Sequence, residues 1–400
     1  MIDAEDNGLV KIVTGMRRSG KSYLLNNIFL NYLLEERGVR RDHIIDISFE
    51  TYRNDDLKTP TSLGEFVDGK ISDSGKYYIL LDEIQEVPRF EAVLSDFLMK
   101  PNVEVYVTGS NSKFLSSDII TEFRGRSSEI RVYPLSFSEF LSAYTGGSKN
   151  EAWREYWNYG GLPLILSQKT PEAKINYLTD IQENTYLKDV VQRNSIKNSK
   201  DLRNVYEIVS SMVGSLTNPL NLANTFKTIN KDKTISDKTV YSYLSYLEDA
   251  FLIEQVKRFD VRGRGYISTP QKYYFTDPGV RNSIIGFRQN DENHVMENIV
   301  YTELRRREYL VDVGALEVRE NGSRKQLEID FVANKGTSRL YIQVALTIGD
   351  KEKLAQEIRP LNGIENNFRK ILVTGDNIER HFDENGIEFV NILDFLCDEE

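Results

Sequence analysis

The sequence predicts an α/β protein with a mainly parallel sheet covered by helices on both faces. Short apolar runs at Val10–Thr14, Tyr78–Leu81 and Val103–Val107 have the length and composition of buried strands. After the first run, apolar residues recur with the i, i+3, i+4 spacing of an amphipathic helix, at Leu24, Leu25, Ile28, Phe29, Tyr32 and Leu33. Strands that alternate with helices indicate parallel pairing, because the chain must cross back over the sheet between them.

Length and composition predict a cytoplasmic protein of several domains. The chain has 400 residues, and domains usually contain roughly 100–200 residues. Apolar residues make up 40% of the chain, and no run approaches the ~18 apolar residues of a membrane helix. The acidic, polar start Met1–Gly8 is unlike a secretory or mitochondrial signal. The single cysteine, Cys397, cannot form an internal disulfide.

The charge makes one broad class of partner unexpected. The formal net charge is −10 and the pI is near 5.2, whereas domains that coat nucleic acid are usually basic over at least one face. A local basic patch within one domain is still compatible with this charge. The histidines and the cysteine are widely separated, so no zinc site with recognisable spacing is predicted.

A phosphate-binding loop is predicted directly after the first strand. Eight consecutive residues match the pattern G-x-x-x-x-G-K-[ST]: Gly15, Met16, Arg17, Arg18, Ser19, Gly20, Lys21 and Ser22. The glycines let successive backbone N–H groups point into one concavity, and the following helix adds its positive end. We expect Lys21 to reach the β- and γ-phosphates of ATP and the Ser22 hydroxyl to coordinate Mg²⁺.

A second, independent element is an apolar strand that ends in two carboxylates. Tyr77–Leu81 is followed by Asp82 and Glu83. Asp82 is expected to hold Mg²⁺ through water, and Glu83 to polarise the attacking water. The alternative is a solvated acidic strand end, but the loop upstream favours catalysis. Together the two elements predict a P-loop NTPase that binds ATP and hydrolyses it.

Two further catalytic candidates follow the third strand, which ends in Thr108-Gly-Ser-Asn111. A polar residue at this strand end can orient the hydrolytic water; Asn111 is the first choice and Ser110 the second. Arg126 is predicted to be an arginine finger that stabilises charge on the γ-phosphate, within the chain or from a neighbouring subunit. The alternative for Arg126 is a surface charge or an ion pair.

The remainder of the chain divides into three predicted parts after the linker-like run Thr145-Gly-Gly-Ser148. Residues 1–145 are expected to form the ATPase core, 146–200 a helical lid, 201–288 a winged helix-turn-helix and 289–400 a C-terminal α/β domain. The winged helix is predicted from several short helices, one of them capped by Ser236, followed by a basic hairpin that turns at Arg262-Gly-Arg-Gly265.

Several specific motifs occur in a fixed order along nearly the whole chain: Thr14–Ser22, Leu81–Gln85, Thr108–Asn111, Gly125-Arg126, Pro134–Phe140, Tyr159–Pro163, Phe275–Gly279 and Glu297–Val300. This set resembles the prokaryotic AAA+-type ATPases that carry the C-terminal domain of unknown function 4143. The resemblance implies an AAA+-like P-loop ATPase core, a small helical lid, a winged helix and a restriction-endonuclease-like C-terminal fold. One departure is the short segment before the first strand, where family members usually carry a few dozen residues.

The fold implied for the C-terminal domain raises the question of a nuclease site. Such nucleases need an acid at a strand end and E-x-K on the adjoining strand, so that two carboxylates hold Mg²⁺ and a lysine positions or deprotonates water. Asp330 supplies the first acid and Glu297 an auxiliary one, but Gln343 and Ala345 stand in the E-x-K positions. We therefore expect an inactive domain. Two nearby lysines lack the required register, Lys325 and Lys335.

The basic hairpin is the candidate nucleic-acid contact. It contains four cations within eight positions, Lys257, Arg258, Arg262 and Arg264. Such a wing commonly touches phosphates, but acids on the preceding helix, Asp237, Glu248 and Asp249, would repel them. At most weak, sequence-independent binding is expected. The alternative is a wing used inside the molecule or against a protein partner or a second copy of the chain.

Three functions are compatible with these features. The leading hypothesis is an ATP-driven molecular switch, in which the nucleotide state changes how core, lid and winged helix pack. The alternatives are an ATP-gated nuclease or DNA-binding ATPase, and a nucleotide-bound scaffold that does not hydrolyse ATP. Retention of Glu83 speaks against the scaffold, and loss of the E-x-K lysine speaks against the nuclease.

Overall fold

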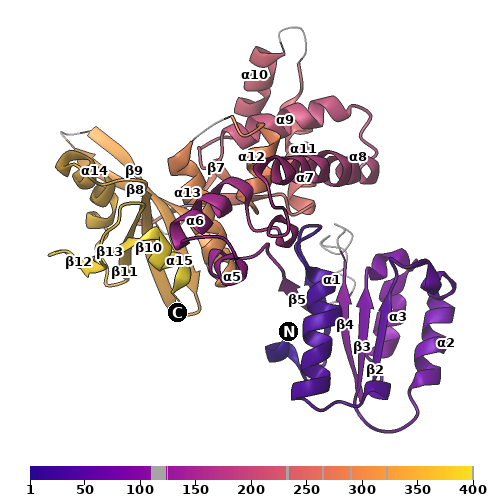
Figure 1. Ribbon diagram of the computed structural model, residues 1–400. Helices are drawn as coiled ribbons and strands as arrows, with labels where there is room; N and C mark the ends of the chain where they lie inside the picture. The colour runs from indigo at the N-terminus through magenta and orange to yellow at the C-terminus, as the bar shows by residue number, and fades with distance from the viewer. Residues whose placement is uncertain are drawn as a thin grey trace. The chain divides into compact units, whose positions relative to one another are not determined.

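The computed structural model describes residues 1–109, 123, 125–230, 234–263, 265–288, 291–320 and 323–398 (Figure 1). The chain divides into two compact units, residues 1–134 and 135–400, each described here by itself. The predicted α/β class is confirmed, with a parallel sheet in the first unit and a mixed sheet in the second. In the part of the chain that is described, every helix is too short or too polar to cross a membrane.

The first unit is built on a five-stranded sheet in the order β2-β3-β4-β1-β5, and every neighbouring pair is parallel. The strands are β1 (Val10–Thr14), β2 (Ile44–Ser48), β3 (Tyr77–Asp82), β4 (Val103–Thr108) and β5 (Ser127–Arg131). Strand β4, the third of the strands predicted from the sequence, lies between β1, which precedes the loop, and β3, which ends in the acids. The carboxyl ends of these three strands therefore meet at one edge of the sheet.

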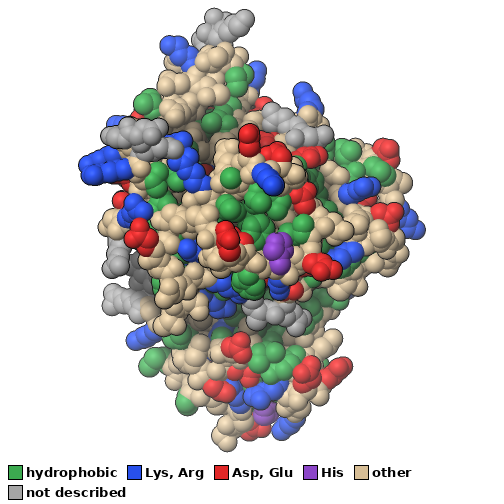
Figure 2. Space-filling model, turned by 90° about the vertical axis from the view of Figure 1, so that its left-hand side faces the viewer, with side chains coloured by type: hydrophobic (Ala, Val, Ile, Leu, Met, Phe, Trp, Pro, Cys, Tyr) green, Lys and Arg blue, Asp and Glu red, His purple; other side chains and the backbone are tan. Residues whose placement is uncertain are grey.

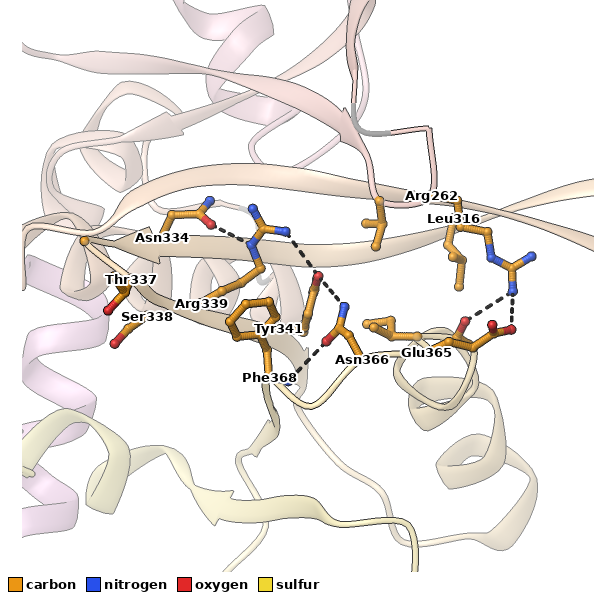
Figure 3. Close-up of a pocket in the computed structure, with 14 residues that line it drawn as sticks. Arg262, Leu316, Asn334, Thr337, Ser338, Arg339, Tyr341, Glu365, Asn366 and Phe368 are labelled. Atoms are coloured by element: carbon orange, nitrogen blue, oxygen red, sulfur yellow. Dashed lines mark hydrogen bonds and ion pairs between the residues drawn. The ribbon is translucent and has the colours of Figure 1, made fainter.

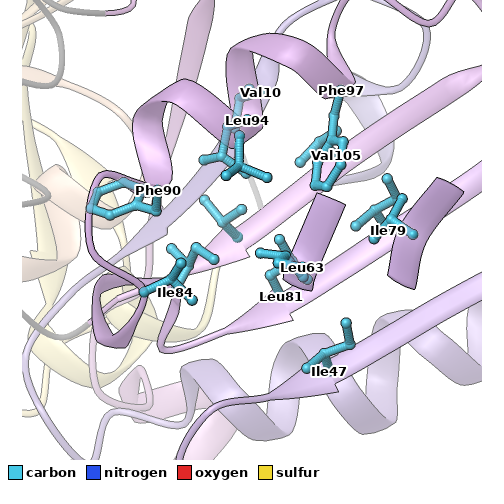
Figure 4. Close-up of a cluster of buried hydrophobic side chains, with 14 of the residues drawn as sticks. Val10, Ile47, Leu63, Ile79, Leu81, Ile84, Phe90, Leu94, Phe97 and Val105 are labelled. Atoms are coloured by element: carbon cyan, nitrogen blue, oxygen red, sulfur yellow. The ribbon is translucent and has the colours of Figure 1, made fainter. Parts of the chain in front are cut away.

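Helices cover both faces of this sheet because its strands carry apolar residues on both sides. The helical segments are η1 (Ile2–Ala4), α1 (Lys21–Tyr23), η2 (Leu24–Phe29), η3 (Tyr32–Glu36), η4 (Arg41–His43), η5 (Tyr52–Leu57), α2 (Pro60–Lys70), η6 (Ile84–Glu86) and α3 (Phe90–Phe97). Ile79 and Leu81 of β3 pack with residues of α2 and α3 (Figure 4). Their neighbours Tyr78 and Leu80 pack against the helix that follows the loop, as the alternation of a strand requires.

The second unit begins with a helical part. Its helical segments, up to the last one before the C-terminal domain, are α5 (Phe137–Ala143), α6 (Lys149–Tyr159), η8 (Pro163–Ile165), α7 (Pro171–Ile181), η9 (Gln182–Leu187), α8 (Lys188–Arg193), α9 (Ser199–Ser211), α10 (Pro219–Ile229), α11 (Asp237–Asp249) and α12 (Pro278–Ile284). As predicted, the Ser236 hydroxyl caps α11, accepting a hydrogen bond from Thr239 N. The compact unit begins at residue 135 and therefore includes α5.

Two short motifs of this helical part pack directly on each other. Asp277, at the start of α12, accepts hydrogen bonds from Val280 N at 2.9 Å and from Gly161 N at 2.7 Å. A side chain on Gly279 would lie 2.0 Å from the Tyr159 carbonyl oxygen, so only glycine fits there. Burial raises the pKa of Asp277 to about 6. The motifs Tyr159–Pro163 and Phe275–Gly279 thus owe their composition to this contact.

An eight-stranded sheet joins the predicted winged helix to the C-terminal domain, in the order β12-β13-β11-β10-β9-β8-β6-β7. Its strands are β6 (Ile253–Asp260), β7 (Gly265–Phe275), β8 (Leu310–Glu320), β9 (Ser323–Lys335), β10 (Ser338–Ala345), β11 (Arg369–Thr374), β12 (His381–Phe382) and β13 (Ile387–Asn391). Its helices are α13 (Glu292–Arg306), α14 (Lys351–Asn362) and α15 (Ile392–Cys397). Strand β6 pairs in parallel with β8, and α13 packs on β7, β8, β9 and β10. One sheet therefore has strands on both sides of the predicted boundary at 288/289.

Candidate nucleotide site

The loop after β1 has the backbone that its glycines predict. Gly15 and Gly20 have φ angles of 140° and 100°, in the range that favours glycine. A Cβ atom at Gly15 would lie 2.1 Å from the Val132 carbonyl oxygen, so the neighbouring backbone segment also excludes a side chain there. Gly20 directly precedes the helix that starts at Lys21, so the helix N-terminus faces the loop. This is the arrangement that phosphate binding requires.

Lys21 is buried within its own loop, with 4% of its surface exposed. Its Nζ donates hydrogen bonds to the carbonyl oxygens of Gly15 and Met16, both at 2.9 Å. Burial lowers the pKa of Lys21 to about 8, although Glu83 and Asp82 act in the opposite direction. The two carbonyl oxygens therefore hold the ammonium near two carboxylates.

The other loop residues form a cradle that fits a phosphate group. Ser19 is buried, and within the described residues its Oγ has no hydrogen-bond partner. A buried hydroxyl without a partner is costly, and a phosphate oxygen would satisfy it. Met16 is buried, Ser22 is partly exposed, and the side chains of Arg17 and Arg18 face solvent. The residues present are thus compatible with a bound nucleotide.

The two acids of β3 are linked through a threonine on β4. Asp82 accepts hydrogen bonds from the Thr108 hydroxyl at 2.5 Å and from the Ser48 hydroxyl at 3.1 Å. The Thr108 oxygen in turn accepts a hydrogen bond from Glu83 N at 3.0 Å. Glu83 has a positive φ of 55°, and its carboxylate accepts a hydrogen bond from the Gln85 side chain. Both acids are buried, so their orientation is fixed by neighbours rather than by solvent.

The polar residue that the structure describes at the end of β4, in contact with both acids, is Thr108. The predicted residues, Asn111 and its alternative Ser110, lie outside the described residues. Thr108 was missed because the sequence search looked beyond the strand end rather than at its last residue. Glu50, just after β2, was also missed; burial raises its pKa, as do the nearby charges of Glu83 and Asp82. Its signal was the position after a parallel strand that neighbours β3.

Arg126 lies at the opposite end of β1 from the phosphate-binding loop. Its carbonyl oxygen accepts a hydrogen bond from Val10 N, the first residue of β1, whereas the loop follows Thr14. The strand between them spans about 13 Å at ~3.3 Å per residue. Arg126 is exposed. This register does not support the within-chain version of the arginine-finger prediction and leaves the version from a neighbouring subunit.

The C-terminal acids are brought close to the positions that replace E-x-K. Asp330 on β9 accepts a hydrogen bond from Val344 N at 2.8 Å. Gln343 on β10 accepts one from Asp330 N at 3.4 Å, and its amide donates to Glu357 at 3.4 Å. Ala345 is buried beside them. Lys335 does not reach this place: its Nζ donates to the Arg307 carbonyl oxygen.

The basic hairpin contacts the C-terminal domain. Arg258 is buried, and its Nη2 donates a 2.6 Å hydrogen bond to Gln326 on β9. Lys257 lies over the ring of Tyr266. Arg262 donates to the Glu317 and Gly363 carbonyl oxygens at the rim of a cavity of about 740 Å³ (Figure 3). Arg264 lies outside the described residues.

For Arg258 and Arg262, these contacts favour the predicted alternative in which the wing is used inside the molecule. Arg258 cannot reach a ligand while it is buried against β9, because β6 continues directly into pairing with β8. On the face drawn in Figure 2, acidic side chains lie among the basic ones. On this face the charge is interspersed, unlike the basic stripe typical of nucleic-acid binders.

Comparisons with known proteins agree with the first unit. Residues 7–141 match an AAA domain, and residues 150–291 match a domain of unknown function (DUF8612). An uncharacterized protein of Haemophilus influenzae is 35% identical over 99% of this chain and 96% of its own length. An uncharacterized protein of Methanocaldococcus jannaschii is 29% identical over 86% and 76%. The Aeropyrum pernix ORC2 protein has a TM-score of 0.42 and 10% identity, covering 74% of this chain and 89% of that one.

The matches support part of the resemblance found in the sequence. The AAA domain confirms the P-loop AAA-type core. The second match, however, is to DUF8612 and not to the domain of unknown function 4143 that the motifs had indicated. It spans residues 150–291, which include the predicted lid and winged helix and end before α13.

Proposed function

We propose that this chain binds ATP with Mg²⁺ and hydrolyses it as a nucleotide-driven molecular switch. The chain belongs to the family of AAA-domain proteins that includes the Haemophilus influenzae relative. The observation that carries the proposal is the meeting of three groups at one sheet edge. These are the buried Lys21 ammonium, the unpartnered Ser19 hydroxyl and the acid pair Asp82–Glu83 held through Thr108.

The loop residues bind the nucleotide in this proposal. The amides of the loop, Gly15 to Ser22, surround the phosphates, and Lys21 leaves the Gly15 and Met16 carbonyls to contact them. Ser22 and Asp82 would hold Mg²⁺, which when bound would supply positive charge against the β- and γ-phosphates. Asp82 is suited to this role because two hydroxyls already fix its carboxylate.

Glu83 acts on the attacking water. A general base must have an orientation that brings its oxygen to the proton it accepts. The Glu83 backbone is fixed by Thr108, and its carboxylate is held by Gln85, so release from Gln85 frees it for water. Asn111 and Arg126 remain additional candidates, the latter acting from a neighbouring subunit.

The second unit is proposed to respond to the nucleotide rather than to cut nucleic acid. Three helices, α9, α10 and α11, precede the hairpin β6–β7, and Thr217 pairs with Gln271 of that hairpin. This order supports a winged helix over residues 201–288, with a lid over 146–200. The C-terminal domain keeps Asp330 but has Gln343 and Ala345 in the E-x-K positions, which supports an inactive nuclease-like fold. The single cysteine in 400 residues supports a reducing, cytoplasmic location.

Two variants test the proposal on one preparation. Glu83→Gln should lower ATP turnover by roughly 10²–10⁴-fold, because general-base catalysis is lost, while ATP stays bound. Lys21→Ala should lose nucleotide binding itself, because a charged donor to the triphosphate is removed. Turnover is measured by phosphate release and binding by titration with a fluorescent ATP analogue.

The pair also controls for contamination. Residual phosphate release in Lys21→Ala measures any foreign ATPase. Equal turnover in wild type and Glu83→Gln would reject Glu83 as the base, and ATP binding without turnover in the wild type would favour the scaffold alternative.

A further inference from the structure

A lysine from the hairpin lies inside the acidic cluster of the C-terminal domain. Lys272, on β7, is 3% exposed. Its Nζ lies 2.7 Å from Glu297 Oε1 on α13 and 2.8 Å from Glu328 Oε1 on β9. Asp330, two residues beyond Glu328, also lies close enough for its charge to act on Lys272. One ammonium from the wing thus reaches acids from two elements of the C-terminal domain.

The carboxylates of this cluster stabilise the charged form of the lysine. Burial by itself would lower the pKa of Lys272, but the carboxylates of Glu297, Asp330 and Glu328 outweigh it and raise the pKa. The Tyr274 hydroxyl, also on β7, donates a further hydrogen bond to Glu297 Oε1. A buried charge is tolerated only when it is paired and hydrogen-bonded in this way.

The same acids are those that a metal-dependent nuclease of this fold would use. Asp330 and Glu297 were the two acids expected at such a site, and Lys272 now stands between Glu297 and the strand that carries Asp330. Glu297 is 3% exposed and Asp330 is 7% exposed, so a phosphodiester cannot reach them while β7 is in place. In the described part of the chain, no three His, Cys, Asp or Glu side chains are arranged to hold a metal ion.

We propose that the Lys272 ammonium is the resident cation of the C-terminal domain: β7 inserts it among Glu297, Glu328 and Asp330 in place of a divalent metal ion, and it closes this cluster to metal ions and nucleic acid. The lysine that is missing from β10 has thus a counterpart on another strand, but one that blocks the site rather than activates it. Because Lys272 belongs to the hairpin, the same contact fastens the winged helix to α13 and β9.

The first test removes the charges singly and together. Lys272→Met should lower the thermal midpoint by about 10 °C, because it leaves buried carboxylates without their partner. Lys272→Met combined with Glu297→Gln should recover part of that loss, because the buried Lys272–Glu297 pair is then removed as a whole. Lys335→Met, a half-exposed lysine at the end of β9, is the matched control and should leave the midpoint unchanged. A double variant no more stable than Lys272→Met would overturn the proposal.

The second test asks what replaces the ammonium. Mn²⁺ alone, without nucleotide, should raise the midpoint of Lys272→Ala but not that of Lys272→Ala combined with Glu297→Gln. The wild type should bind the same amount of Mn²⁺ in equilibrium dialysis as Glu297→Gln, a comparison that needs no lysine variant to fold. A Mn²⁺ site in the wild type that depends on Glu297 would show that Lys272 does not occupy the cluster. Metal-dependent cleavage of single-stranded DNA by the wild type, lost in Lys272→Met, would make Lys272 catalytic and equally overturn it.

Discussion

Three described lysines are almost wholly buried, Lys11, Lys21 and Lys272; the last two lie at the sites discussed above, and their surroundings differ. Lys21 in the P-loop donates to two backbone carbonyls, and its pKa is lowered to about 8 because burial outweighs the nearby carboxylates. Lys272 on β7 contacts the carboxylates of Glu297 and Glu328, and its pKa is raised. The same chemical group is therefore under-compensated in one unit and fully compensated in the other.

The difference separates an open binding site from a closed one. A buried ammonium held by dipoles gains from any ligand that brings full negative charge, such as a triphosphate. A buried ammonium already paired with carboxylates gains nothing from a further ligand, and its loss exposes uncompensated charge. Sequence motifs alone do not distinguish these cases, because the charge compensation of a buried lysine depends on the groups that surround it in the folded chain.

The largest effect on ATP turnover is expected from Arg126, the candidate arginine finger of the nucleotide site. Arg126→Ala should lower ATP turnover by about 10³-fold or more with little change in ATP affinity, because an arginine finger acts on the transition state. Since Arg126 lies at the far end of β1 from the loop, it can do so only from a neighbouring subunit. Arg41→Ala, which removes an exposed arginine paired with Asp46, is the matched control.

Mixing variants decides whether the finger comes from another subunit. Arg126→Ala and Glu83→Gln are each inactive in this account, but their mixture forms sites that combine an intact Glu83 with an intact Arg126. Phosphate release should therefore reappear on mixing and depend on protein concentration. A loss that falls wholly on ATP affinity, with no recovery on mixing, would make Arg126 a ground-state contact or a structural residue.

Local motifs allowed the nucleotide site to be predicted from the sequence, because its parts are set by short segments at strand ends. Gly15 to Ser22 and the pair Asp82–Glu83 need only the order of three parallel strands to meet, and β4 lies between the other two as expected. The α/β class follows from the same periodicity. Thr108 could have been found by reading the last residue of the strand itself.

The C-terminal cluster could not be derived in the same way. Lys272 reaches Glu297 because β6 pairs with β8 and α13 packs on β7, and such long-range pairing leaves no mark in local spacing. For the same reason the sequence left open whether Arg258 contacts phosphate or lies inside the molecule, where its guanidinium donates to Gln326 on β9. The register that carries Arg126 away from the loop was equally hidden.

A smaller effect is expected from pH at the open site. The phosphates bind the charged form of Lys21. At a pH where Lys21 is neutral in the nucleotide-free protein, ATP binding must therefore take up a proton. With a pKa of about 8, ATP affinity should be nearly constant below pH 8 and fall by up to ~10-fold per pH unit above it. Titration with a fluorescent ATP analogue from pH 7 to 10 measures this. Lys21→Arg stays charged, so a similar decline in that variant would assign the titration to another group.

The smallest effect is expected from the wing cations on nucleic-acid binding. Replacing Lys257 and Arg262 together by Ala should change affinity for a labelled duplex by less than ~2-fold. Phosphate contacts dominate such affinities, but Arg262 contacts the Glu317 and Gly363 carbonyl oxygens instead. Arg258→Ala should instead lower the thermal midpoint, because Arg258 is buried on Gln326. The matched charge control replaces two exposed lysines outside the hairpin, Lys200 on α9 and Lys227 on α10.

Salt dependence sharpens this last comparison. Each phosphate contact contributes about 0.9 to the slope of log affinity against log salt concentration. If the wing touches DNA, the Lys257/Arg262 variant will lose about 1.8 from that slope relative to the Lys200/Lys227 control, with both proteins equally stable. If the hairpin serves the C-terminal domain, the two double variants will have the same slope. The hairpin would then be a structural element whose cations act within the molecule, as Lys272 and Arg258 do.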